Sequence, residues 1–333
     1  MAGADQEHPF ARFVRILGKG RTGTRDLTRA EAREAFGMIL RGEAQDVQLG
    51  AFLMLLRVKE ESAEEIAGFV EACRDSMLQP PPDLAADLDW SSYAGKKHQH
   101  PWYILSMLLL ADAGYRVFVH GASGHTPGRL YTQESFAQLD LPVVRDWDEA
   151  AQALDATRLC YMPLQRFCPA LDDIINLRPL FGLRSPVNTL TRLLNPLAAP
   201  ASIQSIFHPA YAAIHQQADQ LLEQPAALVF KGESGEIEVK PHADTRMFTL
   251  RSGQFEDAEL PRSIDQRATP VAAPSVDPLR NLWRAERDDR YGRDATLATL
   301  GAALALLEPH LTHEQAAGRA QQLWRERDRS RLG

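Results

Sequence analysis

Apolar residues recur every three to four positions through the first eighty residues, and this spacing predicts a bundle of amphipathic helices. Thr28 and Ser62 each stand three residues before a glutamate, which is the capping-box arrangement that begins a helix. Asp46 is expected to cap another helix between them, with its apolar positions on one face. The proline run at residues 79–82 predicts the end of the bundle, since consecutive prolines favour a stiff, extended connector.

After residue 80 the pattern changes to short apolar runs that alternate with helical stretches. Strands are predicted at residues 116–119, 141–144, 226–230 and 247–250. Helices are predicted at residues 101–113, 279–293 and 297–307, and Thr312 is expected to cap a last one. This alternation is typical of an α/β fold, so we expect an N-terminal helical bundle joined to a larger α/β domain with a central, mostly parallel sheet.

Two loops of the α/β part carry basic and histidine side chains. The first loop contains Lys96, Lys97, His98 and His100, and the second contains His120, His125 and Arg129. Ligands of open α/β sheets bind beyond the carboxyl ends of the strands, so loops that follow neighbouring strands are expected to face one crevice. No carboxylate occurs between residues 91 and 111, so this crevice should attract anions. No acid–base pair or metal-binding pattern is evident in it, which favours binding over catalysis.

Composition narrows the possible partners. The 333 residues are 44% hydrophobic and 24% charged, which is ordinary for two folded domains. The net charge of −7 excludes a uniformly basic nucleic-acid-binding coat, so a polyanion would have to meet a local patch. Three cysteines lack the spacing of a zinc site, and no signal peptide or apolar run of about 18 residues is evident. These features predict reduced thiols, no membrane partner and a cytoplasmic location.

Three segments resemble glycosyl transferase family 3, the family of the anthranilate phosphoribosyltransferases and the class II nucleoside phosphorylases. Residues 26–69 resemble the helical domain with which these enzymes begin. Residues 181–196 resemble a family segment with a Gly-x-Arg turn, a central asparagine at Asn188 and a closing Asn-Pro. His120 and Gly121 stand within the family's Lys-His-Gly-Asn motif.

The resemblance implies a nucleoside phosphorylase/phosphoribosyltransferase-like fold with two domains. Residues 1–79 together with 164–196 would form a helical domain, and residues 80–163 together with 197–333 would form the α/β domain. The resemblance also implies that two copies pair through their helical domains as a homodimer.

The sequence departs from this family where the enzymes bind phosphate. Residues 91–96 replace a Gly-Thr-Gly-Gly-Asp loop in which bare backbone amides cradle the diphosphate, and only Gly95 is retained. Tyr93 adds a bulky ring, so Lys96 and Lys97 are expected to supply charge in place of oriented amides.

The metal and acceptor positions also differ from the family. Ile237 stands in place of the aspartate of an Asp-Glu magnesium pair, which leaves Glu236 and Glu238 as weak metal candidates that could equally be solvated. On the acceptor side, Asp172 and Asp173 would repel a carboxylate such as anthranilate.

The Ser-Tyr-x-Gly-Lys-Lys loop at residues 92–97 resembles a divergent branch of the family that is associated with sequence-independent DNA binding by a homodimer. We therefore expect a homodimer that binds nucleic acid, and DNA in particular, through a basic cleft derived from the phosphoribosyltransferase site, without a cofactor. The contacts predicted for the cleft are Tyr93, Gly95, Lys96, Lys97, His98, His100, His120, Gly121, Arg129, Arg184, Asn188, Arg192 and Lys231. No residue is assigned a catalytic role.

Two alternatives remain open from the sequence. The first is a phosphoribosyltransferase that acts on an unknown acceptor and needs magnesium, since His120, Gly121 and Asn188 are retained. The second is a purely structural dimer whose cleft binds nothing.

Overall fold

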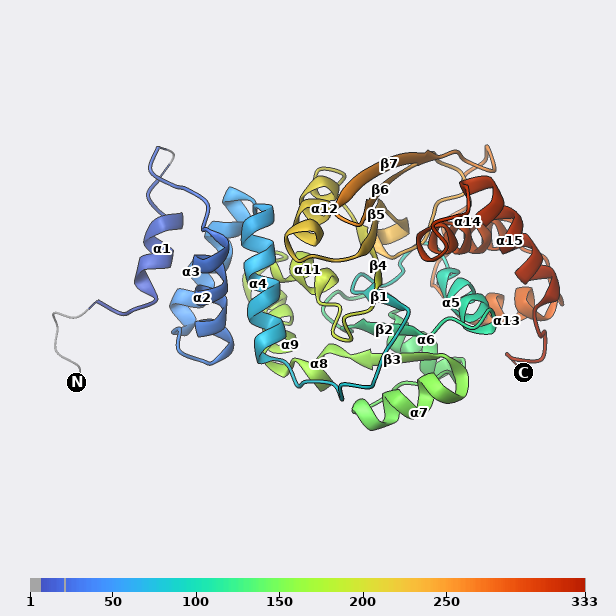
Figure 1. Cartoon of the computed structure of the whole chain (residues 1–333), viewed down its shortest axis with the longest axis horizontal. Helices are drawn as coiled ribbons and strands as arrows, with labels where there is room; N and C mark the ends of the chain where they lie inside the picture. Colours follow the sequence, from blue (N-terminus) through green and yellow to red (C-terminus); the bar gives the residue numbers. More distant parts are fainter. Residues whose placement is uncertain (1–6, 21, 333) are drawn as a thin grey trace.

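The computed structural model describes residues 7–20 and 22–332, so the predicted domain ends at residues 1–6 and 333 lie outside the described residues. Its N-terminal part is a bundle of four helices, α1 (Ala11–Leu17), α2 (Arg29–Leu40), α3 (Asp46–Lys59) and α4 (Ala63–Ser76) (Figure 1). The capping boxes predicted at Thr28 and Ser62 are both present. The predicted second helix is present, but the expectation that Asp46 caps it is wrong, because Gln45 is the cap and Asp46 is the first residue of the helix. The predicted bundle is thus confirmed.

The α/β part is built on one seven-stranded sheet in the order β3-β2-β1-β4-β5-β6-β7. The strands are β1 (Leu88–Ser92), β2 (Val117–Gly121), β3 (Leu159–Pro163), β4 (Ala201–Ile206), β5 (Ala226–Lys231), β6 (Thr245–Arg251) and β7 (Gln254–Leu260). The pairs among β1 to β5 are parallel, whereas β6 and β7 are added antiparallel at one edge. This confirms the predicted fold class, a helical bundle with an α/β domain around a mostly parallel sheet.

Some strands differ from the prediction. The strands expected at residues 116–119, 226–230 and 247–250 are β2, β5 and β6, but residues 141–144 form only an isolated bridge between Val143 and Tyr161. Strand β1 is not among the predicted strands, and Asp89, Ser91 and Ser92 make it too polar for an apolar run. All five β1 residues are buried, and their polar side chains bond inside the protein. An apolar pattern cannot reveal such a strand.

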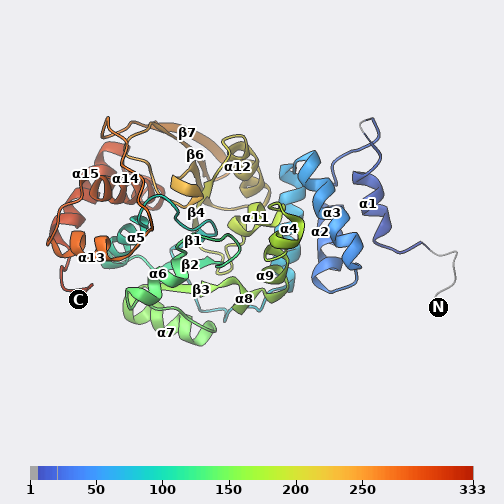
Figure 2. The ribbon, with the colours of Figure 1, turned by 180° about the vertical axis from the view of Figure 1, so that it is seen from behind.

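Helices flank the sheet on both sides. Helices α5 (Tyr103–Asp112) and α14 (Arg290–Leu307) pack together, whereas α12 (Tyr211–Leu221) packs against α4 of the bundle on the opposite side (Figures 1 and 2). The remaining helices of this part are α6 (Thr132–Gln138), α7 (Trp147–Thr157), α13 (Asp277–Arg284) and α15 (His313–Glu326). The single helix predicted at residues 279–293 is interrupted, because Ala285 adopts a left-handed conformation at the end of α13.

Short helices connect β3 to β4 beside the bundle. They are α8 (Leu164–Phe167), α9 (Pro169–Ile175), α10 (Arg178–Phe181) and α11 (Val187–Leu190), followed by the 3-10 turn η1 (Thr191–Leu193). Their apolar side chains belong to the same core as Phe36 and Phe69 of the bundle. This packing carries the loop before α11 to the junction between the bundle and the sheet. In residues 7–20 and 22–332, no helix has the length and apolar composition needed to cross a bilayer.

Candidate functional site

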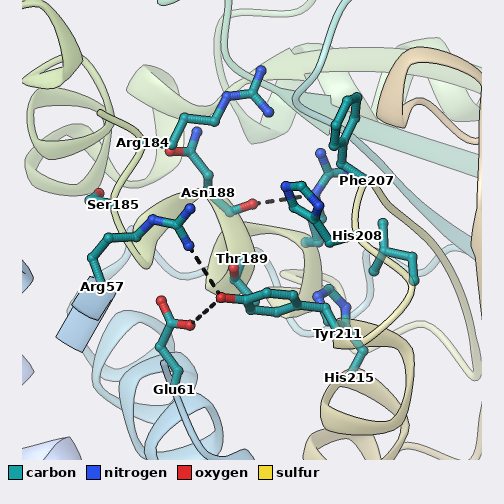
Figure 3. A pocket seen from close by; sticks show the side chains of 12 residues that line it. Arg57, Glu61, Arg184, Ser185, Asn188, Thr189, Phe207, His208, Tyr211 and His215 are labelled. Carbon is teal, nitrogen blue, oxygen red and sulfur yellow. Dashed lines mark hydrogen bonds between the residues drawn. The ribbon is translucent and has the colours of Figure 1, made fainter. Parts of the chain in front are cut away.

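A cavity of about 100 Å³ lies where the bundle meets the carboxyl end of β4 (Figure 3). We call it the arginine cleft because three guanidinium groups line it. Its lining residues are Arg57, Glu61, Arg184, Ser185, Asn188, Thr189, Arg192, Ile206, Phe207, His208, Tyr211 and His215. Carboxyl ends of parallel strands are the usual ligand-binding edge of an open α/β sheet, so the fold places this cleft where a ligand is expected.

Arg184 is the least compensated charge of the arginine cleft. Its side chain is half-buried, and among the described residues it has no carboxylate partner and no hydrogen bond. Burial and, to a smaller extent, the nearby Arg129, Arg192 and Arg178 together lower the pKa of Arg184 to about 10. Guanidinium groups stay charged in proteins, so Arg184 remains positively charged beside the other arginines.

The three arginines close enough to Arg184 to affect its pKa donate to neutral acceptors. Arg192 is almost fully buried and donates to the carbonyl oxygens of Gly235 at 3.0 Å and Asn188 at 3.2 Å. Arg178 donates to the carbonyl oxygen of His125 and to a threonine hydroxyl. Arg129 likewise binds three backbone carbonyl oxygens. These bonds fix the geometry of the guanidinium groups, and none of them goes to a carboxylate.

His125 lies near the same arginines, and their charge affects its pKa. It is buried, and its Nε2 lies 2.9 Å from the carbonyl oxygen of Tyr93. Burial and, to a smaller extent, the nearby Arg184, Arg178 and Arg192 together lower the pKa of His125 to about 4. A neutral imidazole at physiological pH therefore adds no charge to the cluster.

On the bundle side of the cleft, a tyrosine hydroxyl contacts both Glu61 and Arg57. Tyr211 on α12 donates its hydroxyl to Glu61 at 2.9 Å, and Arg57 Nη1 lies 3.5 Å from the same hydroxyl (Figure 3). Burial raises the pKa of Glu61. These contacts tie the end of α3 to the α/β part and position Arg57 at the cleft.

Phe207 supplies an exposed aromatic ring beside these charges. It follows β4, 48% of its surface is exposed, and its ring packs edge-on to His208 at a centroid distance of 5.0 Å. An exposed ring next to guanidinium groups suits a ligand that combines phosphate with a flat base.

The structure does not place Lys96 at the rim of the cleft. Its side chain is fully buried, and Nζ contacts Glu238 Oε1 at 2.6 Å and also pairs with Glu233. Burial opposes the charge, but the two carboxylates outweigh it and raise the pKa of Lys96. The expectation that Lys96 supplies charge to the cleft is wrong, because this lysine pairs with buried carboxylates.

The sequence predicts that the loop at residues 91–96 lacks backbone amides oriented towards an anion, but the structure contains such amides. The N–H groups of Ala94 and Gly95 both donate to Glu236 Oε1 at 2.6 Å, and the Ser92 hydroxyl donates to Oε2 at 2.7 Å. Glu236 is completely buried and Glu238 is bound to Lys96, so neither is solvated and neither is free for magnesium. Over residues 7–20 and 22–332 no cluster of three potential metal-ligating side chains occurs.

Other predicted contacts also have internal partners. The buried Tyr93 hydroxyl lies 2.7 Å from His120 Nδ1, and His120 Nε2 lies 3.2 Å from Asp89, so the ring of Tyr93 cannot stack on a ligand. His100 is bound to the backbone of Ser275. Gly121 is needed for packing, since a Cβ there would collide with the carbonyl oxygen of Ser92.

The remaining predicted residues fall into two groups. Lys97, His98 and Lys231 are exposed and do not line the arginine cleft. Arg184, Asn188 and Arg192 line it together, and Arg129 is close enough to Arg184 to affect its pKa. Sequence reasoning missed Arg57, Phe207 and His208 as cleft residues. The last two follow β4, so predicting that strand would have pointed to them.

Family comparisons cover both parts of the chain. The family model described as "Glycosyl transferase family, helical bundle domain" matches residues 14–77, and the one described as "Glycosyl transferase family, a/b domain" matches residues 104–326. Among curated relatives, the uncharacterized protein YbiB of Escherichia coli is 30% identical over 237 residues, which is 70% of this chain and 73% of YbiB. An anthranilate phosphoribosyltransferase of Methylobacterium radiotolerans is 30% identical over 312 residues, covering 89% of this chain and 86% of the enzyme.

Solved structures share the fold at lower sequence identity. The anthranilate phosphoribosyltransferase of Saccharomyces cerevisiae in complex with PRPP and Mg superposes with a TM-score of 0.78 at 15% identity, covering 96% of this chain and 94% of that one. The enzyme from Thermus thermophilus gives a TM-score of 0.75 at 20% identity, with 96% and 94% covered. Identities this low establish the fold alone.

Proposed function

The chain belongs to glycosyl transferase family 3, and we propose that it binds nucleic acid through the arginine cleft, as a homodimer and without reading the base sequence. The observation that carries this proposal is Arg184, a half-buried guanidinium among three other arginines whose hydrogen bonds go to neutral acceptors. Such a cluster favours the binding of an anion from outside the chain. A nucleic acid supplies a row of phosphates that can meet several guanidinium groups at once.

The exposed ring of Phe207 favours a nucleic acid over a small phosphate. Aromatic side chains beside a basic groove stack with bases of any sequence, because every base has a flat face. The base must be unpaired to reach the ring, so we expect single strands to bind more tightly than duplexes. Contacts to phosphate are the same for every sequence, which accounts for binding without sequence preference.

The homodimer is supported by apolar residues exposed on the bundle. Val47 and Val58 are 78% and 85% exposed, and their spacing puts them on one face of α3. Leu180 and Leu183 are 82% and 55% exposed, and the neighbouring Phe181 lies against Gly50 of α3. Exposed apolar side chains on neighbouring elements are typical of an interface with another protein surface. A second copy would bury them and bring two arginine clefts into one particle.

Phosphoribosyl transfer is the alternative that the names of the relatives favour. The buried Glu236 counts against it, because this carboxylate already occupies the backbone amides of Ala94 and Gly95. Lys96 and Glu238 are likewise bound to each other rather than available to a diphosphate or a metal ion.

Two titrations distinguish nucleic-acid binding from transfer. Fluorescence anisotropy with a labelled single-stranded oligonucleotide is expected to show binding at about 50 mM salt that weakens steeply towards about 200 mM. Calorimetry with phosphoribosyl diphosphate and magnesium is expected to show no metal-dependent binding. Absence of oligonucleotide binding, together with tight metal-dependent binding of phosphoribosyl diphosphate, would overturn the proposal.

A further inference from the structure

Backbone amides at the end of β1 form a small site for an anion. The N–H groups of Ala94 and Gly95 converge on one point, and Gly95 adopts a left-handed conformation with φ of 67°. Successive N–H groups that converge in this way bind phosphate and carboxylate oxygens in many proteins. We call these two amides, with the Ser92 hydroxyl beside them, the amide site.

The amide site is already filled by the protein's own carboxylate. Both amides bind Glu236 Oε1 at 2.6 Å, the Ser92 hydroxyl binds Oε2 at 2.7 Å, and Glu236 is 0% exposed. Charge-assisted bonds of this length are the stronger class of hydrogen bond. Glu236 lies close enough to Arg192 to stabilise the guanidinium charge. The carboxylate therefore interacts with a cation as well as with the amides.

Contacts on both sides of Glu236 in the sequence connect its segment to the loop that forms the amide site. Lys96 directly follows the amide site and pairs with Glu233 and Glu238, which flank Glu236 in the sequence. Arg129 donates to the carbonyl oxygens of both Gly95 and Ser234 and so joins the same two loops. These contacts hold the carboxylate in the amide site, where it occupies the donors that a second anion would need.

We propose that Glu236 is a built-in anion that closes the amide site to phosphate, and that the site takes inorganic phosphate or a phosphate monoester once this carboxylate is removed. Glu236 is thus the residue that excludes small phosphate ligands from the chain. The proposal does not depend on nucleic-acid binding, because the two amides and the hydroxyl of the amide site do not line the arginine cleft, although Arg192 lies near both.

The test compares phosphate binding by the full chain and by Glu236→Ala, using calorimetry with inorganic phosphate. The variant keeps both amides, the hydroxyl and Arg192, so its affinity for phosphate is expected to exceed that of the wild type by at least about tenfold. Glu233→Ala is the matched control. It removes one carboxylate from the same loop and changes the net charge equally, but it leaves Glu236 on the amides, so it should bind phosphate no better than the wild type.

Amide NMR resonances of Ala94 and Gly95 locate the ligand. They are expected to move on addition of phosphate in Glu236→Ala and to stay unchanged in the wild type. If Glu236→Ala does not fold, Glu236→Gln preserves the size of the side chain and removes its charge, and a smaller gain in phosphate affinity is expected. A folded variant that binds phosphate no better than wild type, or that binds it without moving these two resonances, would overturn the proposal.

Discussion

Replacing Lys96 by methionine should destabilise the fold strongly. The lysine is 0% exposed and its Nζ lies 2.6 Å from a Glu238 oxygen that is equally buried. Methionine fills similar space but leaves Glu238 without its cation. Removal of one partner of a buried ion pair costs about 3–5 kcal/mol, a large part of the roughly 5–15 kcal/mol that stabilises a typical protein.

The loss of stability caused by Lys96→Met should depend on pH in a defined direction. Burial raises the pKa of Glu238 to about 7 in the folded protein, although Lys96 opposes this shift. A carboxyl group whose pKa is raised on folding favours the folded state below its ordinary pKa, and this contribution is lost as the pH rises through the folded value. Without Lys96 the pKa of Glu238 rises further. The variant should therefore be most destabilised above pH 7 and recover as the pH falls towards about 5.

Urea unfolding followed by tryptophan fluorescence measures this effect at pH values on either side of 7. Lys97→Met is the control, because Lys97 is exposed and its substitution should change the free energy of unfolding by no more than about 0.5 kcal/mol. The reasoning is refuted if Lys96→Met costs less than about 1 kcal/mol above pH 7 and instead weakens oligonucleotide binding. That result would place Lys96 in the binding surface.

Two further predictions concern the ring beside the cleft and the dimer. Phe207→Ala should weaken binding of a single-stranded oligonucleotide by about 1–3 kcal/mol, measured by anisotropy, with a smaller change for a duplex of the same sequence. Equal losses for both would exclude base stacking on this ring. Leu180→Glu adds a charge at a position that is 82% exposed and should shift the protein from dimer to monomer in sedimentation velocity. If that variant sediments like the wild type, Leu180 lies outside any interface between copies.

Elements set by local contacts were predictable from the sequence. The capping boxes at Thr28, Ser62 and Thr312 begin their helices as predicted, because each depends on residues three positions apart. The resemblance to a known family identified Arg184 and Arg192 as residues of the cleft.

Features that depend on distant partners were not predictable. The partners of Lys96 lie more than 130 positions away, so nothing near it in the sequence distinguishes a buried counter-ion from a surface charge. The same holds for Glu236, which reaches the amides of Ala94 and Gly95 from a distant loop. Strand β1 was missed because its polar side chains are satisfied inside the protein.

Whether the arginine cleft holds phosphates is tested most directly by the salt dependence of oligonucleotide affinity in the wild type and Arg184→Gln. Each lost phosphate contact lowers the slope of log affinity against log salt by about 0.7 for single strands. Arg184→Gln is therefore expected to bind more weakly and with a slope about 0.7 shallower, whereas the control Arg41→Gln, at an exposed position on the bundle, should match the wild type. An unchanged affinity and slope for Arg184→Gln would contradict nucleic-acid binding at this cleft.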